Sequence, residues 1–247
     1  MKLLPRSSYL LAAVTLLGLF GGQSASAGIF TIDFDNLPTL GPTTQQQSLA
    51  DANGGSSTID GVTFASNFGV AGSEYRVGGA APNPTFGIPH SGDYFLINGN
   101  TPNNDLLIST TSVLLEAWFG RVEYYGYGGG AISVTVTAFG AGGDLGSESI
   151  NLPDTNPYTG NLPAPNDGIG NGLADPMLRL DTSSFLSLVG ITGYRISRVD
   201  PEPLNGNWAA DDFTFSTTSA VPEPSTLTGF GIGLVALGYY RRRSLTR

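Results

Sequence analysis

Two short acidic segments carry the residues best suited to binding chemistry. Asp33 and Asp35 lie near the start of the chain's middle part, and Asp211 and Asp212 lie near its end. On a β-strand Asp33 and Asp35 point to one face, because successive side chains alternate. If the first and last strands are neighbours, the four carboxylates meet, and such clusters need a cation, a proton or an arginine. Since Ca²⁺ binds carboxylate and carbonyl oxygens, these residues predict a structural calcium site.

Two alternatives to this site stay open. The four acids could lie in solvated turns or pair with Arg195 and Arg198. A second calcium candidate is the Asx- and Gly-rich segment 166–175. It has no Glu at the twelfth position that an EF-hand loop requires, so an ordinary turn-rich loop is the better interpretation.

A group of aromatic residues suggests a second kind of chemistry. Tyr124, Tyr125 and Tyr127 precede a glycine run, and Trp208 lies near the end of the middle part. Amphipathic aromatic faces can stack on sugar rings, so these four side chains predict a polysaccharide-binding surface. The alternative is that the aromatic residues pack in the core, above all Trp118.

Catalytic groups are present without a catalytic pattern. Glu74, Glu116, Glu123 and Glu148 could supply the paired carboxylates of a glycosidase, but none of them lies in a motif. The sequence has one histidine, His90, and no Gly-x-Ser-x-Gly segment places a serine for it. We therefore expect no enzyme, and no catalytic residue is assigned.

Charge and cysteine content narrow the function classes. Residues 28–220 hold nineteen of the twenty acidic residues and five of the eleven basic ones, so this part has a formal net charge of −14. Such a surface repels nucleic acid, which is bound through Lys and Arg. The chain has no cysteine, which excludes thiol catalysis, thiolate metal sites and disulfides.

The middle part is rich in Gly, Thr, Ser, Asn and Pro, a composition that favours strands and turns over helices. Short apolar or alternating segments separated by turn residues predict an all-β fold, a β-sandwich or jelly roll. One short helix is expected at 183–189, capped by Asp181 or Thr182, and a long loop at 154–175. The expected strands are 29–34, 61–64, 75–78, 94–98, 106–109, 113–119, 122–127, 132–139, 146–152, 178–181, 191–198 and 213–217.

Both ends of the chain resemble targeting segments. Lys2 and Arg6 precede a short apolar run, and a small-x-small site ends at Ala27, so residues 1–27 are predicted to be a signal peptide. That signal implies the Sec export machinery and signal peptidase as partners. Residues 28–218 are then the β-sandwich domain, and residues 219–247 form a sorting tail.

The tail has three parts. The first is Val221, Pro222, Glu223 and Pro224, whose prolines favour the extended backbone that a processing enzyme can bind. Residues 226–240 form an apolar, glycine-rich segment, predicted to be a short transmembrane helix of about 22 Å. The third part is Arg241, Arg242 and Arg243, which the positive-inside rule keeps in the cytoplasm.

These three parts, in this order, resemble the PEP-CTERM sorting signal. The resemblance implies recognition by an exosortase, a membrane-embedded cysteine protease–transpeptidase, with the Val221–Pro224 segment as substrate. Members of that family are exported, and many are linked to biofilm or exopolysaccharide. The resemblance therefore implies a cell-surface or extracellular-matrix protein that is anchored transiently in the membrane.

The middle part is loosely similar to jelly-roll carbohydrate-binding domains. The matching stretches are Phe34-Asp35 and Asp211-Asp212-Phe213. In those domains acids at both chain ends hold a structural Ca²⁺. The combined hypothesis is an exported matrix protein that is structural or binds polysaccharide. A passive surface scaffold and a matrix-polymer hydrolase are the alternatives.

Overall fold

The structure is a computed structural model that describes residues 28–66, 68–76, 87–98, 105–122, 130–152, 175–199 and 207–217. The predicted signal peptide and the sorting tail, with its predicted transmembrane helix, lie outside these residues. Within them, no helix has both the length and the apolar character needed to cross a membrane. Ile29–Thr217 forms one compact unit, which contains every described strand.

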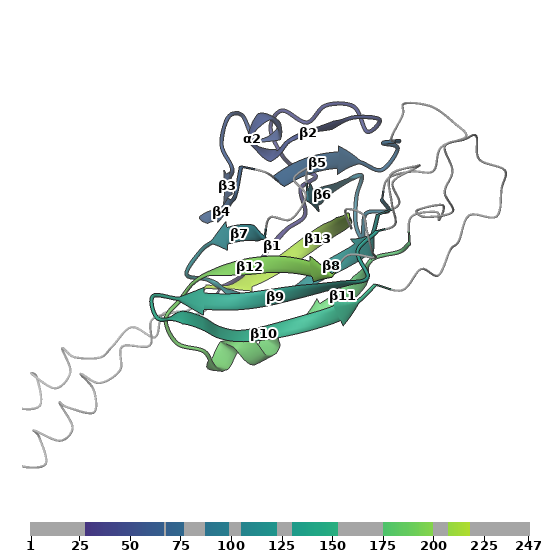
Figure 1. Cartoon of the computed structure of the whole chain (residues 1–247). Helices are drawn as coiled ribbons and strands as arrows, with labels where there is room; N and C mark the ends of the chain where they lie inside the picture. The colour runs from purple at the N-terminus through teal and green to yellow at the C-terminus, as the bar shows by residue number, and fades with distance from the viewer. Residues whose placement is uncertain are drawn as a thin grey trace, which may run out of the picture. The chain divides into compact units, whose positions relative to one another are not determined.

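The unit is a β-sandwich of two antiparallel sheets, as the sequence predicted (Figure 1). The larger sheet has seven strands in the order β11-β8-β13-β6-β5-β2, and β1 pairs with β13 beside this path. Its strands are β1 (Ile29–Ile32), β2 (Gln46–Ser48), β5 (Phe68–Gly72), β6 (Tyr94–Asn98), β8 (Val113–Arg121), β11 (Leu178–Asp181) and β13 (Trp208–Ser216).

The smaller sheet has six strands in the order β10-β9-β12-β7-β4-β3. Its strands are β3 (Thr58–Ile59), β4 (Val62–Phe64), β7 (Leu106–Ser109), β9 (Ser133–Gly140), β10 (Gly143–Asn151) and β12 (Ile191–Val199). The long strands β9, β10 and β12 lie side by side in Figure 1, and their registers pair residue by residue over most of their length.

The core lies between the sheets and takes side chains from both. Val134 and Val136 of β9 and Leu96 and Phe119 of the other sheet belong to one buried cluster. The sandwich centre contains edge-to-face aromatic pairs, such as Phe64 with Phe68 at a centroid distance of 5.5 Å. Such pairs stabilise a core beyond their buried area.

The ends of the unit lie side by side. β1 and β13 pair in antiparallel register, with Ile29 opposite Ser216 and Ile32 opposite Phe213. The expected pairing of the first and last strands is therefore confirmed. The predicted first strand is too long, because it ends at Ile32 and Phe34 has a φ of 61°. This left-handed residue turns the chain and places the Phe34 side chain in the core.

The two short helices differ from expectation. The predicted helix at 183–189 is a 3₁₀-helix, η1, over Ser183–Ser187. The sequence did not predict α2 (Leu49–Ala52), whose N-cap Ser48 accepts a hydrogen bond from the Asp51 backbone N–H through its side chain. This single turn buries Leu49 and Ala52, so packing and the cap stabilise a helix too short to be marked by sequence periodicity.

Candidate functional site

The four acids of the predicted calcium site gather where β1 leads into its following turn beside β13. Asp33 and Asp35 follow β1, and Asp211 and Asp212 lie within β13. Asp212 has a φ of 47° and lies where the β13–β8 register shifts, so a β-bulge sets the direction of its side chain. The structure thus brings these residues into one neighbourhood, called here the acidic cluster.

Residues 87–93, the cover segment, dock on this cluster through backbone N–H groups. His90 and Ser91 donate to Asp211 Oδ2 at 3.0 and 3.1 Å. Asp93 and Tyr94 donate to Asp35 Oδ1 at 2.8 and 3.0 Å. Each carboxylate therefore holds two consecutive backbone amides of a segment more than fifty residues away in sequence.

Gly92 allows this close approach. Its φ is 53°, and a Cβ at this position would lie 1.7 Å from Asp35 Oδ2. Glycine is thus required by conformation and by space at the same position.

Asp212 binds the side chains of the same segment. Its Oδ2 lies 2.5 Å from His90 Nδ1, and its Oδ1 accepts a hydrogen bond from Ser91 Oγ at 2.9 Å. The His90 ring stacks on Trp118 with ring centroids 3.5 Å apart. The histidine is held from two sides and is about one-third exposed.

Burial changes the proton affinity of the cluster. It raises the pKa of Asp211 to about 8, with the negative charges of Asp212 and Asp35 acting in the same direction and the Ser91 N–H acting against it. Burial also raises the pKa of Asp35, and the N–H groups of Asp93 and Tyr94 oppose that shift. Protonation therefore relieves part of the repulsion among these carboxylates, a role for which the sequence predicted a calcium ion.

The contacts of the cluster do not match a calcium site. Both oxygens of Asp211 accept backbone N–H bonds, and both oxygens of Asp212 face His90 or Ser91. Calcium needs oxygen acceptors whose lone pairs are available. Among the described residues, no group of three or more His, Asp and Glu side chains is arranged to hold a metal ion. Calcium binding stays a prediction without structural support.

The cluster contains a His–Asp pair without the geometry of a catalytic triad. Ser91 Oγ donates to Asp212 and not to the imidazole of His90, so the histidine does not activate it. Three of the glutamates considered for hydrolysis have structural partners: Thr43 for Glu74, Arg179 for Glu116 and Ser184 for Glu148. Glu123 lies outside the described residues.

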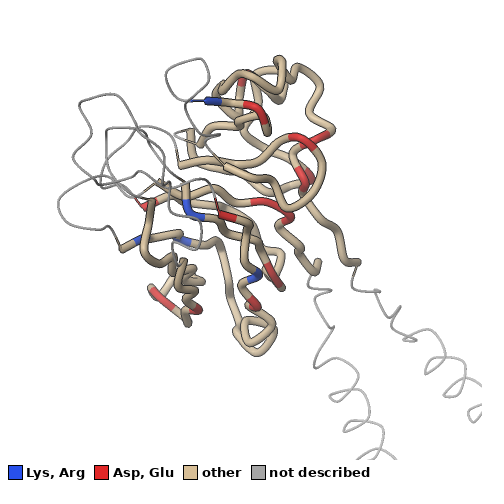
Figure 2. Tube along the Cα trace, turned by 90° about the vertical axis from the view of Figure 1, so that its right-hand side faces the viewer, with Lys and Arg blue, Asp and Glu red and all other residues tan. Residues whose placement is uncertain are grey.

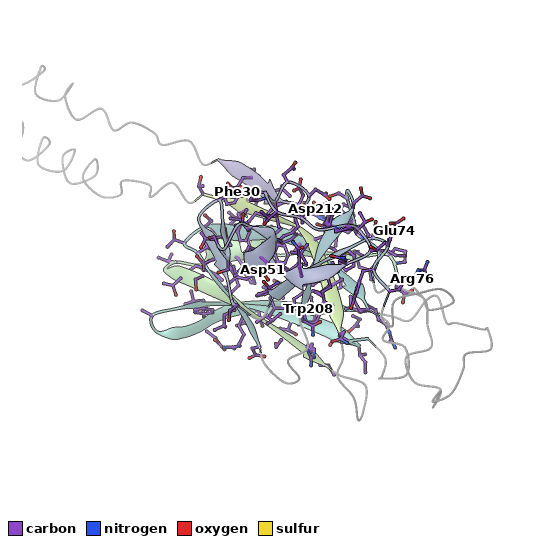
Figure 3. The ribbon with its side chains drawn as sticks, turned by 90° about the horizontal axis from the view of Figure 1, so that it is seen from above. Phe30, Asp51, Glu74, Arg76, Trp208 and Asp212 are labelled. Atoms are coloured by element: carbon purple, nitrogen blue, oxygen red, sulfur yellow. The ribbon has the colours of Figure 1, made fainter. Side chains whose placement is uncertain are left out.

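The predicted aromatic surface is corrected at Trp208. Its side chain is 1 % exposed and packs edge-on against Phe68 and Phe119, at centroid distances of 6.3 and 5.6 Å. Figure 3 shows it among the strands. Trp208 lies on a central strand of the seven-stranded sheet and belongs to the core cluster, so it cannot stack on a sugar. Tyr124, Tyr125 and Tyr127 lie outside the described residues.

Two other surface features were not predicted from the sequence. One is the outer face of the six-stranded sheet, which is rich in hydroxyl groups. The alternation of Ser133, Thr135 and Thr137 with valines was its sequence signal. The other is an open hollow beside Tyr75 and Gln46, which no local pattern marks because its walls come from separate segments.

Comparison with known proteins identifies the tail. Residues 220–244 match the PEP-CTERM protein-sorting motif. This match includes Val221–Pro224 and the arginines 241–243, so the predicted sorting signal is confirmed. No curated protein and no solved structure matches the chain. The motif indicates export, sorting to the cell surface and an exosortase as processing partner.

Proposed function

We propose that this exported, exosortase-sorted protein is a non-catalytic surface module that binds uncharged polysaccharide of the extracellular matrix. The observation that carries the proposal is the solvent-facing side of the six-stranded sheet. Its outward positions hold mainly hydroxyl side chains, and the opposite side is packed in the core. This outward surface is called the hydroxyl face.

The hydroxyl groups form rows across the strands. Thr135 of β9 lies opposite Ser149 of β10 on one side and Ser197 of β12 on the other. Thr63 of β4 lies opposite Ser109 of β7. The face comprises Thr58, Thr63, Ser109, Ser133, Thr135, Ser147, Ser149 and Ser197. A hydroxyl donates and accepts, so such rows suit a polymer that is itself covered with hydroxyls.

An apolar surface accompanies the hydroxyls. The Phe139 ring lies over Gly193, where a Cβ would be 2.7 Å from the ring carbon Cζ. Leu107 on β7 is 45 % exposed. Since sugar rings have apolar C–H faces as well as hydroxyls, an aromatic ring beside hydroxyl rows supports saccharide binding.

Charge favours a neutral polymer. Arg195 lies on this face, but its guanidinium binds Asp144 at 2.7 Å and Asp105 at 3.3 Å. Acidic segments outnumber basic ones along the described chain (Figure 2). An acidic polysaccharide would meet repulsion from a domain with an excess of carboxylates, and a neutral one would not.

The two ends of the domain belong to the sheet opposite the hydroxyl face. Ser216 of β13 pairs with Ile29 of β1, so the first and last strands of the domain lie side by side in the seven-stranded sheet. The hydroxyl face belongs to the other sheet.

The test uses Ile29–Thr217, which contains its own core. Native exopolysaccharide should retain this domain in a pull-down, with or without a chelator. The variant T135A/S149A removes a hydroxyl pair 2.8 Å apart from the hydroxyl face. Retention should fall about fivefold or more, since each lost hydrogen bond is worth about 0.5–1.5 kcal/mol.

The chain offers a matched control. T31A/T214A removes a similar pair, 3.0 Å apart, from the other sheet. It should bind polymer like the unmodified domain. Absence of retention for the folded, unmodified domain would overturn the proposal in favour of a passive scaffold.

A further inference from the structure

An open hollow of about 400 Å³ lies at the edge of the seven-stranded sheet. Its size falls in the range of small-molecule sites, about 300–1,000 Å³. Seven described residues line it: Gln46, Gln47, Ser48, Ser66, Phe68, Gly69 and Tyr75. Two glutamines, two serines and two aromatic residues thus line one concave surface with Gly69, and none of the described lining residues is charged.

The floor of the hollow depends on Gly69. This residue lies opposite Ser48 in the β2–β5 register and lines the hollow with its backbone. A Cβ at this position would be 3.1 Å from Ile97 Cγ1. Tyr75 packs against the outer apolar cluster that contains Ile97, which fixes the aromatic wall.

The walls divide into fixed and accessible groups. Gln47 accepts from the Gly41 N–H through Oε1 and donates to the Thr39 carbonyl through Nε2, both at 3.1 Å. Gln46 and Ser66, in contrast, are exposed. An exposed amide and an exposed hydroxyl above a rigid floor can bind adjacent hydroxyls of one ligand, because each group both donates and accepts.

The neutral lining restricts the ligand class. Glu74 and Arg76 flank Tyr75 in sequence and project outward at the rim of the molecule (Figure 3). No described side chain of the lining could neutralise a phosphate or carboxylate, which argues against an anionic ligand.

We propose that this hollow is a saccharide site, separate from the hydroxyl face, that binds one neutral sugar unit between Gln46, Ser66 and Tyr75. The unit is either free or the end of a polymer chain. The site lies on the other sheet, so it can exist whether or not the hydroxyl face binds polysaccharide.

The test is a titration of ¹⁵N-labelled Ile29–Thr217, followed by NMR. The probes are neutral oligosaccharides released from native exopolysaccharide by partial hydrolysis, with glucuronic acid as the charged counterpart. The Gln46 side-chain amide and the Gly69 N–H should shift and saturate with the neutral probes and stay unchanged with glucuronic acid. Q46A and S66A should each weaken binding about threefold to tenfold, as expected for one lost hydrogen bond.

Q45A is the matched control, because it removes an amide next to Gln46 that does not line the hollow. It should bind like the unmodified domain. If intact polymer also shifts Gln46 and loses this effect after its chain ends are oxidised, the ligand is a polymer end. If only the free fragments shift Gln46, the ligand is a free sugar.

Two results would overturn the inference. Shifts confined to residues near Thr135 and Phe139 would leave polysaccharide binding on the hydroxyl face and would exclude the hollow as a saccharide site. The absence of a shift at Gln46 with every neutral fragment would also exclude the hollow as a saccharide site, whatever the pull-down shows. Conversely, saturable shifts at Gln46 without polymer retention would keep the hollow and reject the proposed function.

Discussion

The two sheets share a core, but their outer faces differ in character. The hydroxyl face of the six-stranded sheet is open to solvent. The outer face of the seven-stranded sheet carries a second buried apolar cluster, with Tyr75 and Trp118 packed against it. Its members are Ala71, Phe95, Ile97, Val122, Met177 and Ala209. One sheet thus leaves its outer face open to solvent, and the other requires a cover.

The cover segment supplies part of that cover. Gly87 lies against the Phe95 ring, where a Cβ would be 2.7 Å from Cε2, and His90 stacks on Trp118. The acidic cluster holds this segment through Asp35 and Asp211. A binding site is therefore not needed to explain these acids, since they fasten the cover segment over an apolar face.

The largest expected effect compares one phenylalanine on each outer face. Phe95→Ala empties a fully buried position and should cost about 3–5 kcal/mol of unfolding free energy. Phe139→Ala removes a half-buried ring outside both apolar clusters and should cost about 1 kcal/mol or less. Urea denaturation of Ile29–Thr217 measures both. Equal losses would mean that the two outer faces are equally covered.

A double variant sharpens this result. Gly87→Ala alone should destabilise the domain, because its Cβ meets the Phe95 ring. In the Phe95→Ala background the same change should cost much less, since the opposing ring is gone. Additive losses would show that the cover segment does not rest on Phe95.

The next effect tests how the cover segment is fastened. Gly92→Ala places a Cβ on Asp35 at a positive φ, so strain and the loss of two amide hydrogen bonds should together cost about 3 kcal/mol. Gly190→Ala has a φ of 81° and no atom within 4 Å, so it isolates the conformational cost, about 1 kcal/mol. Gly142→Ala has open space and should change little. If Gly92→Ala lowers the unfolding free energy no more than Gly190→Ala does, Asp35 does not fasten the cover segment.

The sequence pattern of the strands indicates the contrast between the two outer faces better than it indicates how the cover segment is fastened. Alternation in β9 is the pattern of a strand with one open face, and the apolar run of β6, Tyr94–Asn98, fits a strand buried on both sides. The predicted bounds of β6, β7 and β11 agree with the structure. Among the described strands the sequence missed β2, β3 and β5, because β2 and β3 are very short and β5 reads Phe-Gly-Val-Ala-Gly, with too little bulk to alternate.

Long-range contacts explain the rest of the difference. His90 meets Asp212 across 122 residues, and no periodicity marks a lone histidine near a turn. The pairing of the first and last strands brings the acids together as expected, although Asp33 and Asp35 follow β1 instead of lying on it. Their partners could not be predicted, because backbone N–H groups have no sequence signature. Trp208 was misassigned for a related reason: a tryptophan beside glycine and asparagine resembles a loop residue until pairing places it in the middle of a sheet.

Acidity provides a third test of the fastening. Burial raises the pKa of Asp211 to about 8, above its ordinary value of 3.8. The folded state therefore binds a proton that the unfolded state releases, and this group's contribution is full below pH 4 and lost as the pH rises to about 8. The raised pKa of Asp35 acts in the same direction.

Chemical denaturation at steps of pH between 4 and 9 measures this effect. The unfolding free energy of the unmodified domain should fall across that window, and Asp211→Asn should flatten the slope. Asp181, whose pKa is lowered by hydrogen bonds from Ser183, should add a loss only at the acidic end. A slope unchanged by Asp211→Asn would show that this carboxyl is ionised throughout.

Calcium should produce the smallest effect. The sequence pattern predicts binding at Asp33, Asp35, Asp211 and Asp212, whereas hydrogen bonds occupy both oxygens of Asp211 and Asp212 and Oδ1 of Asp33 and Asp35. We expect the unfolding free energy in millimolar Ca²⁺ and in EDTA to differ by less than about 0.5 kcal/mol. Ligand at a hundred times its Kd would instead stabilise the domain by about 2.7 kcal/mol. A gain of that size, absent with Mg²⁺ and in Asp33→Asn, would support the calcium site. The ion and the cover segment would then together hold the two ends of the domain in place.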